Sequence, residues 1–234
     1  MHPSNPSDQN QAISDATEQV DFVRLFAVSQ RLYMDEIEQS GWTADDDFRP
    51  VSSLRIEQRM LGIHPDDPSA PLAEIDCTTS VDSSGVSVRS TVRWLRPVSV
   101  AAGYGMMFPI VGTFADKLMT GLGHRYDATA TDGSRTYLLD HDRSLSYAYV
   151  HEPEGAHGEH ETMIAMSVRD IASTFRYGQA GRSSADALIF LEHRNVNIQK
   201  LYPKVYDHHT TQPGDVYEAS GVYFIGERPA VAQL

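Results

Sequence analysis

The amino-acid sequence predicts a mainly β fold, an antiparallel β-sandwich or distorted barrel preceded by an N-terminal helix. From residue 51 onward, short segments alternate apolar and polar residues, which is the pattern of half-buried strands. Polar turns rich in Gly, Asp and Ser separate many of these segments, as in a meander of antiparallel strands. The length of 234 residues is one at which a single sandwich or barrel is common.

One longer helix is expected, and it lies near the N-terminus. Residues 1–13 are polar and rich in Pro, Ser and Asn, which predicts a disordered leader. Residues 14–41 carry apolar side chains at helical spacing, and Gly41 stands where helices commonly end. An acidic connector completes the segment 14–50. The β domain is then expected over residues 51–234.

The strands of this domain follow from alternation with a period of two. Leu54–Leu61 has one apolar side, and His64–Pro71 is expected to be a loop. The polar turn Asp82–Gly85 separates Leu72–Val81 from Val86–Leu95, which predicts a hairpin.

The remaining elements are shorter or more ambiguous. Glu161–Tyr177 fits both a helix face and a strand, and a strand is preferred for its first half. The other expected elements are a glycine-interrupted strand within Pro97–Ile110, a short helix at Phe114–Met119, a hairpin formed by Ala128–Ala130 and Arg135–Leu139, and strands at Leu145–His151, Ala187–Glu192, Val196–Leu201 and Val216–Ile225.

The composition argues against several classes of partner. The formal net charge is −13, from 32 acidic and 19 basic residues, and no basic stripe offsets it. Neither nucleic acid nor an anionic membrane is therefore expected as a partner. The single cysteine, Cys77, forms no intrachain disulfide and is expected to be a buried, inert thiol. The polar start lacks a recognisable signal peptide, which predicts a cytoplasmic protein or one exported without such a signal.

The histidines indicate where a site is to be sought. Eight of the ten fall between His124 and His209. Histidine is the side chain whose unperturbed pKa lies near neutrality, so this region is the first candidate for proton transfer or metal binding.

One candidate surface is the segment Leu145–His151. On a strand, Tyr147, Tyr149 and His151 share a face. Two tyrosines on one face form a flat platform on which sugar rings stack, and the histidine adds a titratable group. The alternative is that both tyrosines face the core.

Two further segments combine histidine, arginine and tyrosine. His193 and Arg194 follow an apolar strand, and a second group is His124–Arg125–Tyr126. A histidine or tyrosine base beside an arginine suits the abstraction of a proton next to a carboxylate or ketone. The alternative is a solvated strand end with an ion pair. The candidate catalytic residues are His151, His193, Tyr149 and Arg194, and the candidate ligand-binding residues are Tyr147, His124, Arg125, Tyr126 and Tyr202.

A metal site has weak support. His157, His160 and Glu161 lie close together, with His208 downstream, but no His-x-His pair places two ligands on one strand face. A polar loop is the simpler reading, so no cofactor is expected and a divalent metal stays an alternative. The glycine-rich nucleotide signatures, the serine nucleophile elbow and paired C-x-x-C motifs are also missing.

These patterns leave three hypotheses for function. The first is an enzyme that acts on a carbohydrate or a similar polyhydroxy or anionic small molecule by histidine and tyrosine acid–base chemistry. The second is a non-catalytic protein that binds glycan or self-assembles, with a homo-oligomer formed through the N-terminal segment. The third is a metal-dependent β-barrel enzyme.

Overall fold

The computed structural model consists of β-strands and their connections, and no helix occurs in the residues that it describes. In that part of the chain there is accordingly no helix long and apolar enough to cross a membrane. The described residues are 13–14, 19–20, 24–40, 50–64, 67–104, 106–111, 114–138, 146–150, 162–173, 189–194 and 198–227.

Contacts within the chain define two compact units. The first unit draws on residues 1–103, 170–179 and 205–220, and the second on residues 104–169, 180–204 and 221–234. Four strands contribute residues to both units, namely β8 (Ser99–Tyr104), β14 (Thr162–Ser173), β16 (Ile198–Thr210) and β17 (Val216–Glu227).

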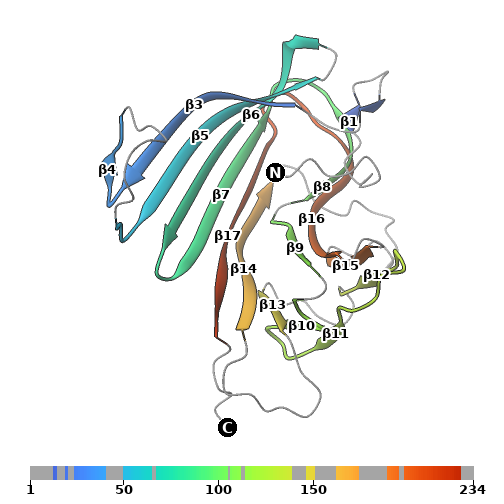
Figure 1. The fold of residues 1–234 in the computed structure, drawn as a ribbon. Coiled ribbons are helices and arrows are strands. Elements are labelled where there is room, and N and C mark those ends of the chain that lie inside the picture. The colour runs from blue at the N-terminus through green and yellow to red at the C-terminus, as the bar shows by residue number, and fades with distance from the viewer. Residues whose placement is uncertain are drawn as a thin grey trace, which may run out of the picture. The chain divides into compact units, whose positions relative to one another are not determined.

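The first unit is built around a broad antiparallel sheet. Its strands lie side by side and curve together in Figure 1. Their order is β4 (Ile37–Glu38), β3 (Arg24–Met34), β5 (Leu54–His64), β6 (Asp67–Asp82), β7 (Gly85–Trp94) and β17. A smaller set of strands pairs in the order β2 (Gln19–Val20), β1 (Ile13–Ser14), β8 (Ser99–Tyr104) and β16.

The β6–β7 hairpin confirms the turn predicted from the sequence. Asp82 pairs with Gly85 across the turn. The carboxylate of Asp82 accepts hydrogen bonds from the backbone N–H of Ser84 at 2.7 Å and from its hydroxyl at 2.6 Å. Gly85 has a φ of 126°, a backbone conformation that side chains with a Cβ rarely adopt.

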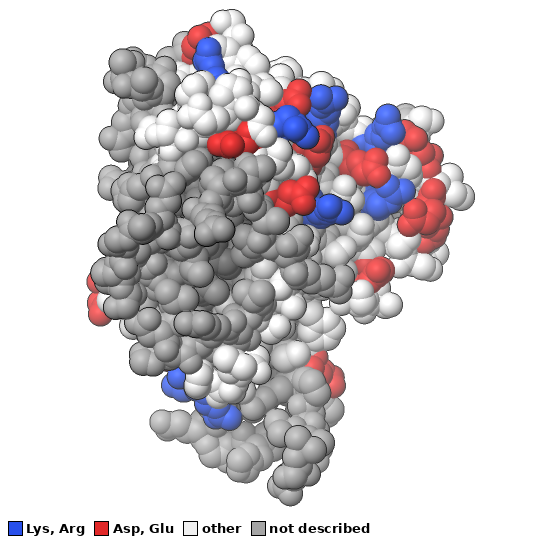
Figure 2. Space-filling view, turned by 180° about the vertical axis from the view of Figure 1, so that it is seen from behind, with Lys and Arg blue, Asp and Glu red and all other residues white. Residues whose placement is uncertain are grey.

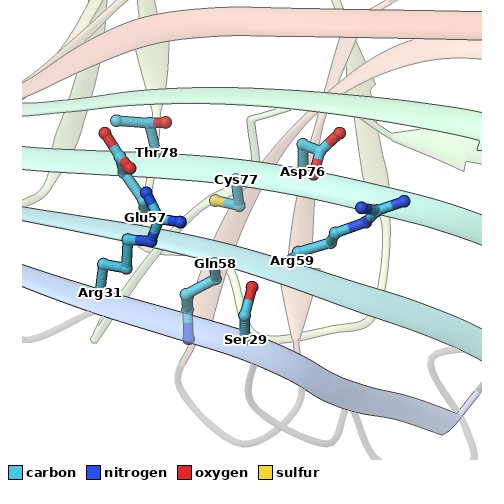
Figure 3. Close-up of a pocket in the computed structure, with 8 residues that line it drawn as sticks. All are labelled: Ser29, Arg31, Glu57, Gln58, Arg59, Asp76, Cys77 and Thr78. Carbon is cyan, nitrogen blue, oxygen red and sulfur yellow. The ribbon is translucent and has the colours of Figure 1, made fainter.

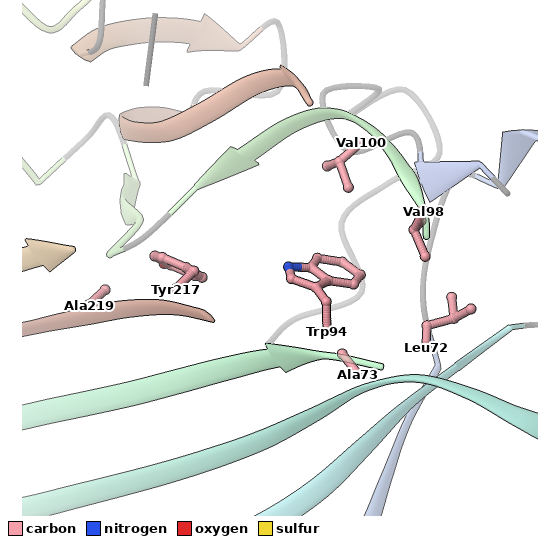
Figure 4. Close-up of a cluster of buried hydrophobic side chains, with 7 residues drawn as sticks. All are labelled: Leu72, Ala73, Trp94, Val98, Val100, Tyr217 and Ala219. Atoms are coloured by element: carbon pink, nitrogen blue, oxygen red, sulfur yellow. The ribbon is translucent and has the colours of Figure 1, made fainter. Parts of the chain in front are cut away.

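The apolar core of the first unit surrounds Trp94 (Figure 4). The indole is 3% exposed, with Leu72 and Ala73 of β6 beside it. Thr211 forms two hydrogen bonds with Val98 of this core. Its backbone N–H donates to the Val98 carbonyl at 2.9 Å, and its hydroxyl oxygen accepts from the Val98 N–H at 3.0 Å. The other members of the cluster are Val98, Val100, Tyr217 and Ala219.

The second unit contains two groups of paired strands. One has the order β11 (Arg125–Asp127), β10 (Lys117–Thr120), β13 (Ser146–Val150) and β14. The other consists of β12 (Arg135–Tyr137), β15 (Ile189–Arg194), β16 and β9 (Phe108–Val111). Its buried side chains include Leu118, Tyr149, Met166, Leu191 and Leu201.

The predicted N-terminal helix is wrong where the structure describes this segment. Residues Arg24–Met34 form β3 and pair with β5 from end to end, with one register shift between Ala27 and Ser29. Asp35 and Glu36, with φ angles of 49° and 66°, then turn the chain into β4. Long-range pairing with β5 satisfies the backbone and overrides the local helical spacing of apolar residues.

Other local expectations are corrected or confirmed by strand pairing. The expected short helix at Phe114–Met119 is wrong, because β10 occupies Lys117–Thr120. Strand β6 begins at Asp67, inside the expected loop His64–Pro71. The ambiguous segment Glu161–Tyr177 contains a strand, β14, as preferred for its first half.

Candidate functional site

The first unit carries an open polar hollow of about 310 Å³ on the sheet formed by β3, β5 and β6 (Figure 3). Six of its lining residues carry charged groups or hydroxyls, and Gln58 and Cys77 complete the lining. These six are Ser29, Arg31, Glu57, Arg59, Asp76 and Thr78.

Strand register brings the six residues into two cross-strand rows. Arg59 lies opposite Ser29 on one side and opposite Asp76 on the other. Two residues away on each strand, Glu57 lies opposite Arg31 and Thr78. Because side chains two apart on a strand point to the same face, the two rows form one continuous polar surface.

The arginines beside the hollow are engaged by neighbouring groups. Arg59 forms an ion pair with Glu74 at 3.1 Å. Arg55 pairs with Glu57 and, at 3.1 Å, with Glu36. Its guanidinium also lies 3.8 Å from the centre of the Tyr33 ring.

Tyr33 joins this network from β3. Its hydroxyl donates to Glu57 Oε2 at 3.3 Å. A side-chain hydrogen bond between Tyr33 and Arg31 raises the pKa of Arg31 above its ordinary value. Arg31 is therefore a fixed positive charge at the hollow.

Three polar groups of the hollow have no partner in the part of the chain that the structure describes. These are the carboxylate of Asp76 and the hydroxyls of Ser29 and Thr78. Ser29 and Asp76 are exposed, while Thr78 is half-buried. Together they offer hydrogen-bond acceptors and hydroxyl donors to a bound molecule.

Charges of both signs are mixed on the surrounding surface. Figure 2 shows Lys and Arg interspersed with Asp and Glu over the side on which the strands of the first unit lie. On β7 and β17 the same pattern continues, since Arg89 approaches Glu218 at 3.8 Å and the Thr91 hydroxyl donates to Glu218 at 3.3 Å.

The tyrosines expected to form a platform lie in the core of the second unit. Tyr147 is 2% exposed and Tyr149 is 0% exposed. The Tyr149 hydroxyl donates to the Phe108 carbonyl at 3.3 Å, and the two rings are 4.9 Å apart. Burial raises the pKa of Tyr149 well above its ordinary range. The structure thus places Tyr147 and Tyr149 in core packing, the alternative that the sequence left open.

Tyr126 belongs to the same cross-strand row as Tyr149. Both lie opposite Leu118 of β10, one on each side of that strand. His124 and Arg125 are exposed at the start of β11. The structure thus brings Tyr126 and Tyr149 onto one sheet face, although as packing residues.

His193 is also inside the second unit, where it is 3% exposed. Its Nδ1 lies 2.6 Å from the Gln199 Oε1 and its Nε2 lies 3.0 Å from the Thr136 hydroxyl. An amide oxygen only accepts, so Nδ1 donates to Gln199, and the second nitrogen, Nε2, is hydrogen-bonded to the Thr136 hydroxyl. With both ring nitrogens bonded, His193 joins β12, β15 and β16 in a buried polar network.

The other candidates of the sequence fall outside what the structure describes. His151, His157, His160 and Glu161 are not among the described residues. Arg194, Tyr202 and His208 lie on described strands, but their side chains are not described. Among the side chains that are described, no three potential metal ligands come together.

The hollow was missed at the level of the sequence although a signal for it was present. Arg55, Glu57 and Arg59 alternate with apolar residues on β5, and this alternation marks one face of the strand as polar. The residues opposite them, on β3 and β6, become known only with the register, because the local pattern of β3 predicts a helix.

Comparison with known proteins shows a fold and no family. No family model and no curated protein matches the chain. Its structure resembles that of the GH36 α-galactosidase AgaA A355E from Geobacillus stearothermophilus in complex with 1-deoxygalactonojirimycin, with a TM-score of 0.53 and 10% identity. AgaB from the same organism gives a TM-score of 0.52 and 10% identity. The α-galactosidase from Lactobacillus brevis gives 0.54 and 8%.

The similarity covers most of this chain and a minor part of those enzymes. It extends over 93% of this chain but over only 30% of the two Geobacillus enzymes and 29% of the Lactobacillus enzyme. The structural neighbours act on carbohydrates, and what they share with this chain is a β-rich fold.

A first testable consequence of the structure concerns Tyr223 of β17. Its hydroxyl donates to the Met107 carbonyl at 2.8 Å, and burial raises its pKa from 10.0 to about 12. Below pH 10 both the folded and the unfolded chain keep the proton. Between pH 10 and 12 only the folded chain keeps the phenol proton. The free energy of unfolding therefore falls as the pH rises, by roughly 1.4 kcal/mol per pH unit.

We therefore expect the order of stability of the wild type and Tyr223→Phe to invert. At pH 8 the variant should be less stable by about 1 kcal/mol, the contribution of one hydrogen bond. Toward pH 12 the wild type should become the less stable of the two, because the variant has no phenol to ionise. Urea unfolding of both proteins across this range measures the difference, and a constant difference would contradict the prediction.

Proposed function

We propose that this protein is a non-catalytic carbohydrate-binding β-protein whose ligand occupies the polar hollow on β3, β5 and β6. The observation that carries the proposal is the convergence of unpartnered acceptor and hydroxyl groups with a fixed arginine in one hollow. The likeness in fold to carbohydrate-acting enzymes supports the same class of ligand.

The hydrogen-bonding groups of the hollow match those of a sugar. A saccharide hydroxyl donates one hydrogen bond and accepts others, so it is bound best by acceptors and donors side by side. Asp76 supplies a charged acceptor, Arg31 a charged donor, and Ser29 and Thr78 act as either. Hydrogen bonds to charged groups are the stronger ones, at roughly 1.5–3 kcal/mol each.

The described part of the second unit supports binding over catalysis. Its best acid–base candidates, His193 and Tyr149, are buried and hydrogen-bonded to protein groups. A general acid or base must come within hydrogen-bond reach of the ligand. An acid–base role for His151, His193 or Arg194 stays a prediction, and turnover by the wild type would favour it over the present proposal.

Calorimetric titration with raffinose and stachyose tests the proposal, since both sugars occur as ligands in structures of the neighbouring AgaA variants. We expect a dissociation constant near the millimolar range, which corresponds to about −4 kcal/mol. Arg31→Ala should weaken binding about tenfold, because it removes a charge-assisted hydrogen bond of roughly 1.5 kcal/mol.

The matched control is Arg93→Ala. Arg93 is exposed on β7, lies opposite Glu74 in the register and does not line the hollow. Its substitution should leave the dissociation constant within about twofold of the wild-type value. Equal losses in both arginine variants, or no heat of binding with any neutral oligosaccharide, would overturn the assignment. Release of free monosaccharide would overturn its non-catalytic part.

A further inference from the structure

We propose that the hollow selects neutral saccharides that present two adjacent hydroxyls to Asp76, and that it rejects acidic sugars. This inference rests on the proposed function and names the ligand class of the same site. It follows from the carboxylate of Asp76, which the ion pairs at the hollow leave without a partner among the described residues.

The guanidinium groups at the hollow lie beside acidic side chains. Arg59 pairs with Glu74 at 3.1 Å, and Glu57 is held by Arg55. Arg31 faces Glu57 across the register and is hydrogen-bonded to Tyr33. An anionic ligand would therefore have to compete with acidic side chains for each guanidinium.

Asp76 is the acid that these pairings leave out. Although Arg59 lies directly opposite it in the register, the guanidinium pairs with Glu74 instead. The Asp76 carboxylate is exposed and makes no ion pair or hydrogen bond with any residue that the structure describes. At Asp76 the unpaired charge is thus negative, on a chain whose formal net charge is already −13.

An unpaired carboxylate selects its ligand by hydrogen bonding. An ionised carboxylate accepts only, through two oxygens, so two hydroxyls on adjacent ring carbons can donate to it together. Thr78 lies two residues from Asp76 on β6, and Ser29 lies on β3 across Arg59 of β5, so that their hydroxyls can bond other oxygens of the same ligand. A ring that carries its own carboxylate or sulfate adds repulsion at short range, where screening by salt is weakest.

The experiment compares sugars that differ in one group. Galactose and galacturonic acid share a ring and differ by the carboxylate at C6, and glucose and glucuronic acid form a second pair. Dissociation constants at neutral pH come from calorimetry or from ligand-observed NMR. We expect each neutral sugar to bind at least tenfold more tightly than its acid.

Asp76→Asn tests whether this residue carries the selection. The variant should bind galactose about tenfold more weakly. Its dissociation constants for galactose and galacturonic acid should also differ less than those of the wild type. Because Asp76 is exposed and unpartnered among the described residues, the melting temperature should stay unchanged, which separates a binding effect from unfolding. Asp82→Asn is the control, since it makes the same charge change on the same strand at the β6–β7 turn.

The outcomes separate this inference from the proposed function. Equal or tighter binding of the uronic acids by the wild type, or unchanged galactose binding by Asp76→Asn, would overturn the inference and leave carbohydrate binding standing. If no sugar of either charge class binds, the proposed function itself is overturned.

Discussion

Trp94→Ala should lower the free energy of unfolding by roughly 3–5 kcal/mol, the range for removing a buried aromatic side chain. Trp94 ends β7 and is 3% exposed in the cluster that also contains Leu72 and Val98. Its backbone also joins β7 to the turn that precedes β17, because its N–H donates to the Asp215 carbonyl and its carbonyl accepts from the Gly214 N–H, each at 2.8 Å. Those backbone bonds persist in the variant, so the loss measures side-chain packing.

Trp94→Phe provides the graded comparison. The indole Nε1 is buried without a hydrogen-bond partner among the described residues. Phenylalanine removes this unsatisfied donor and leaves a smaller cavity than alanine does, so we expect it to be the milder variant by at least 1 kcal/mol.

Chemical unfolding followed by circular dichroism measures both changes. Leu122→Ala serves as a surface control, because Leu122 is 63% exposed and its loss should change stability by less than about 0.5 kcal/mol. Equal stabilities of Trp94→Ala and Leu122→Ala would show that the Trp94 cluster is not a cooperative core.

The parts of the fold that were predicted correctly depend on neighbouring residues. The β6–β7 hairpin follows from a polar turn between two alternating segments, and Asp82 and Gly85 supply the turn chemistry within four residues. The mainly β class likewise follows from many short alternating segments, each of which is a local signal.

The parts that were mispredicted depend on distant pairing. Whether Arg24–Met34 is helical or extended is decided by its pairing with β5, in which Tyr33 lies opposite Arg55. The candidate site depends on the same information, because Ser29, Arg59 and Asp76 form a row only in the register that the structure shows. For the histidine-rich region, residue type alone does not reveal that His193 is buried with both ring nitrogens hydrogen-bonded.

Gln199→Leu should be the most damaging polar substitution in the second unit. Gln199 is 0% exposed, accepts from His193 Nδ1 at 2.6 Å and donates through Nε2 to the Ala130 carbonyl at 2.7 Å. Leucine fills similar space but leaves the buried imidazole N–H and the half-buried Ala130 carbonyl without these partners. Each unsatisfied group costs about 1–3 kcal/mol, so we expect a loss of roughly 2–5 kcal/mol.

Gln58→Leu is the matched control for this change. Gln58 is half-buried on β5 of the first unit, and its amide reaches Gln30 only at 3.5 Å. The same substitution there removes a weak, exposed hydrogen bond and should change stability by less than about 1 kcal/mol.

His193→Gln then separates a structural from a chemical role for the histidine. If the buried network is its function, this variant should lose stability as Gln199→Leu does, and the double variant should lose less than the sum, because the two residues share one hydrogen bond. Additive losses in the urea-unfolding cycle would contradict that coupling. Sugar binding in the hollow of the first unit should be the same in His193→Gln, Gln199→Leu and the double variant once they are folded, because neither His193 nor Gln199 lines the hollow.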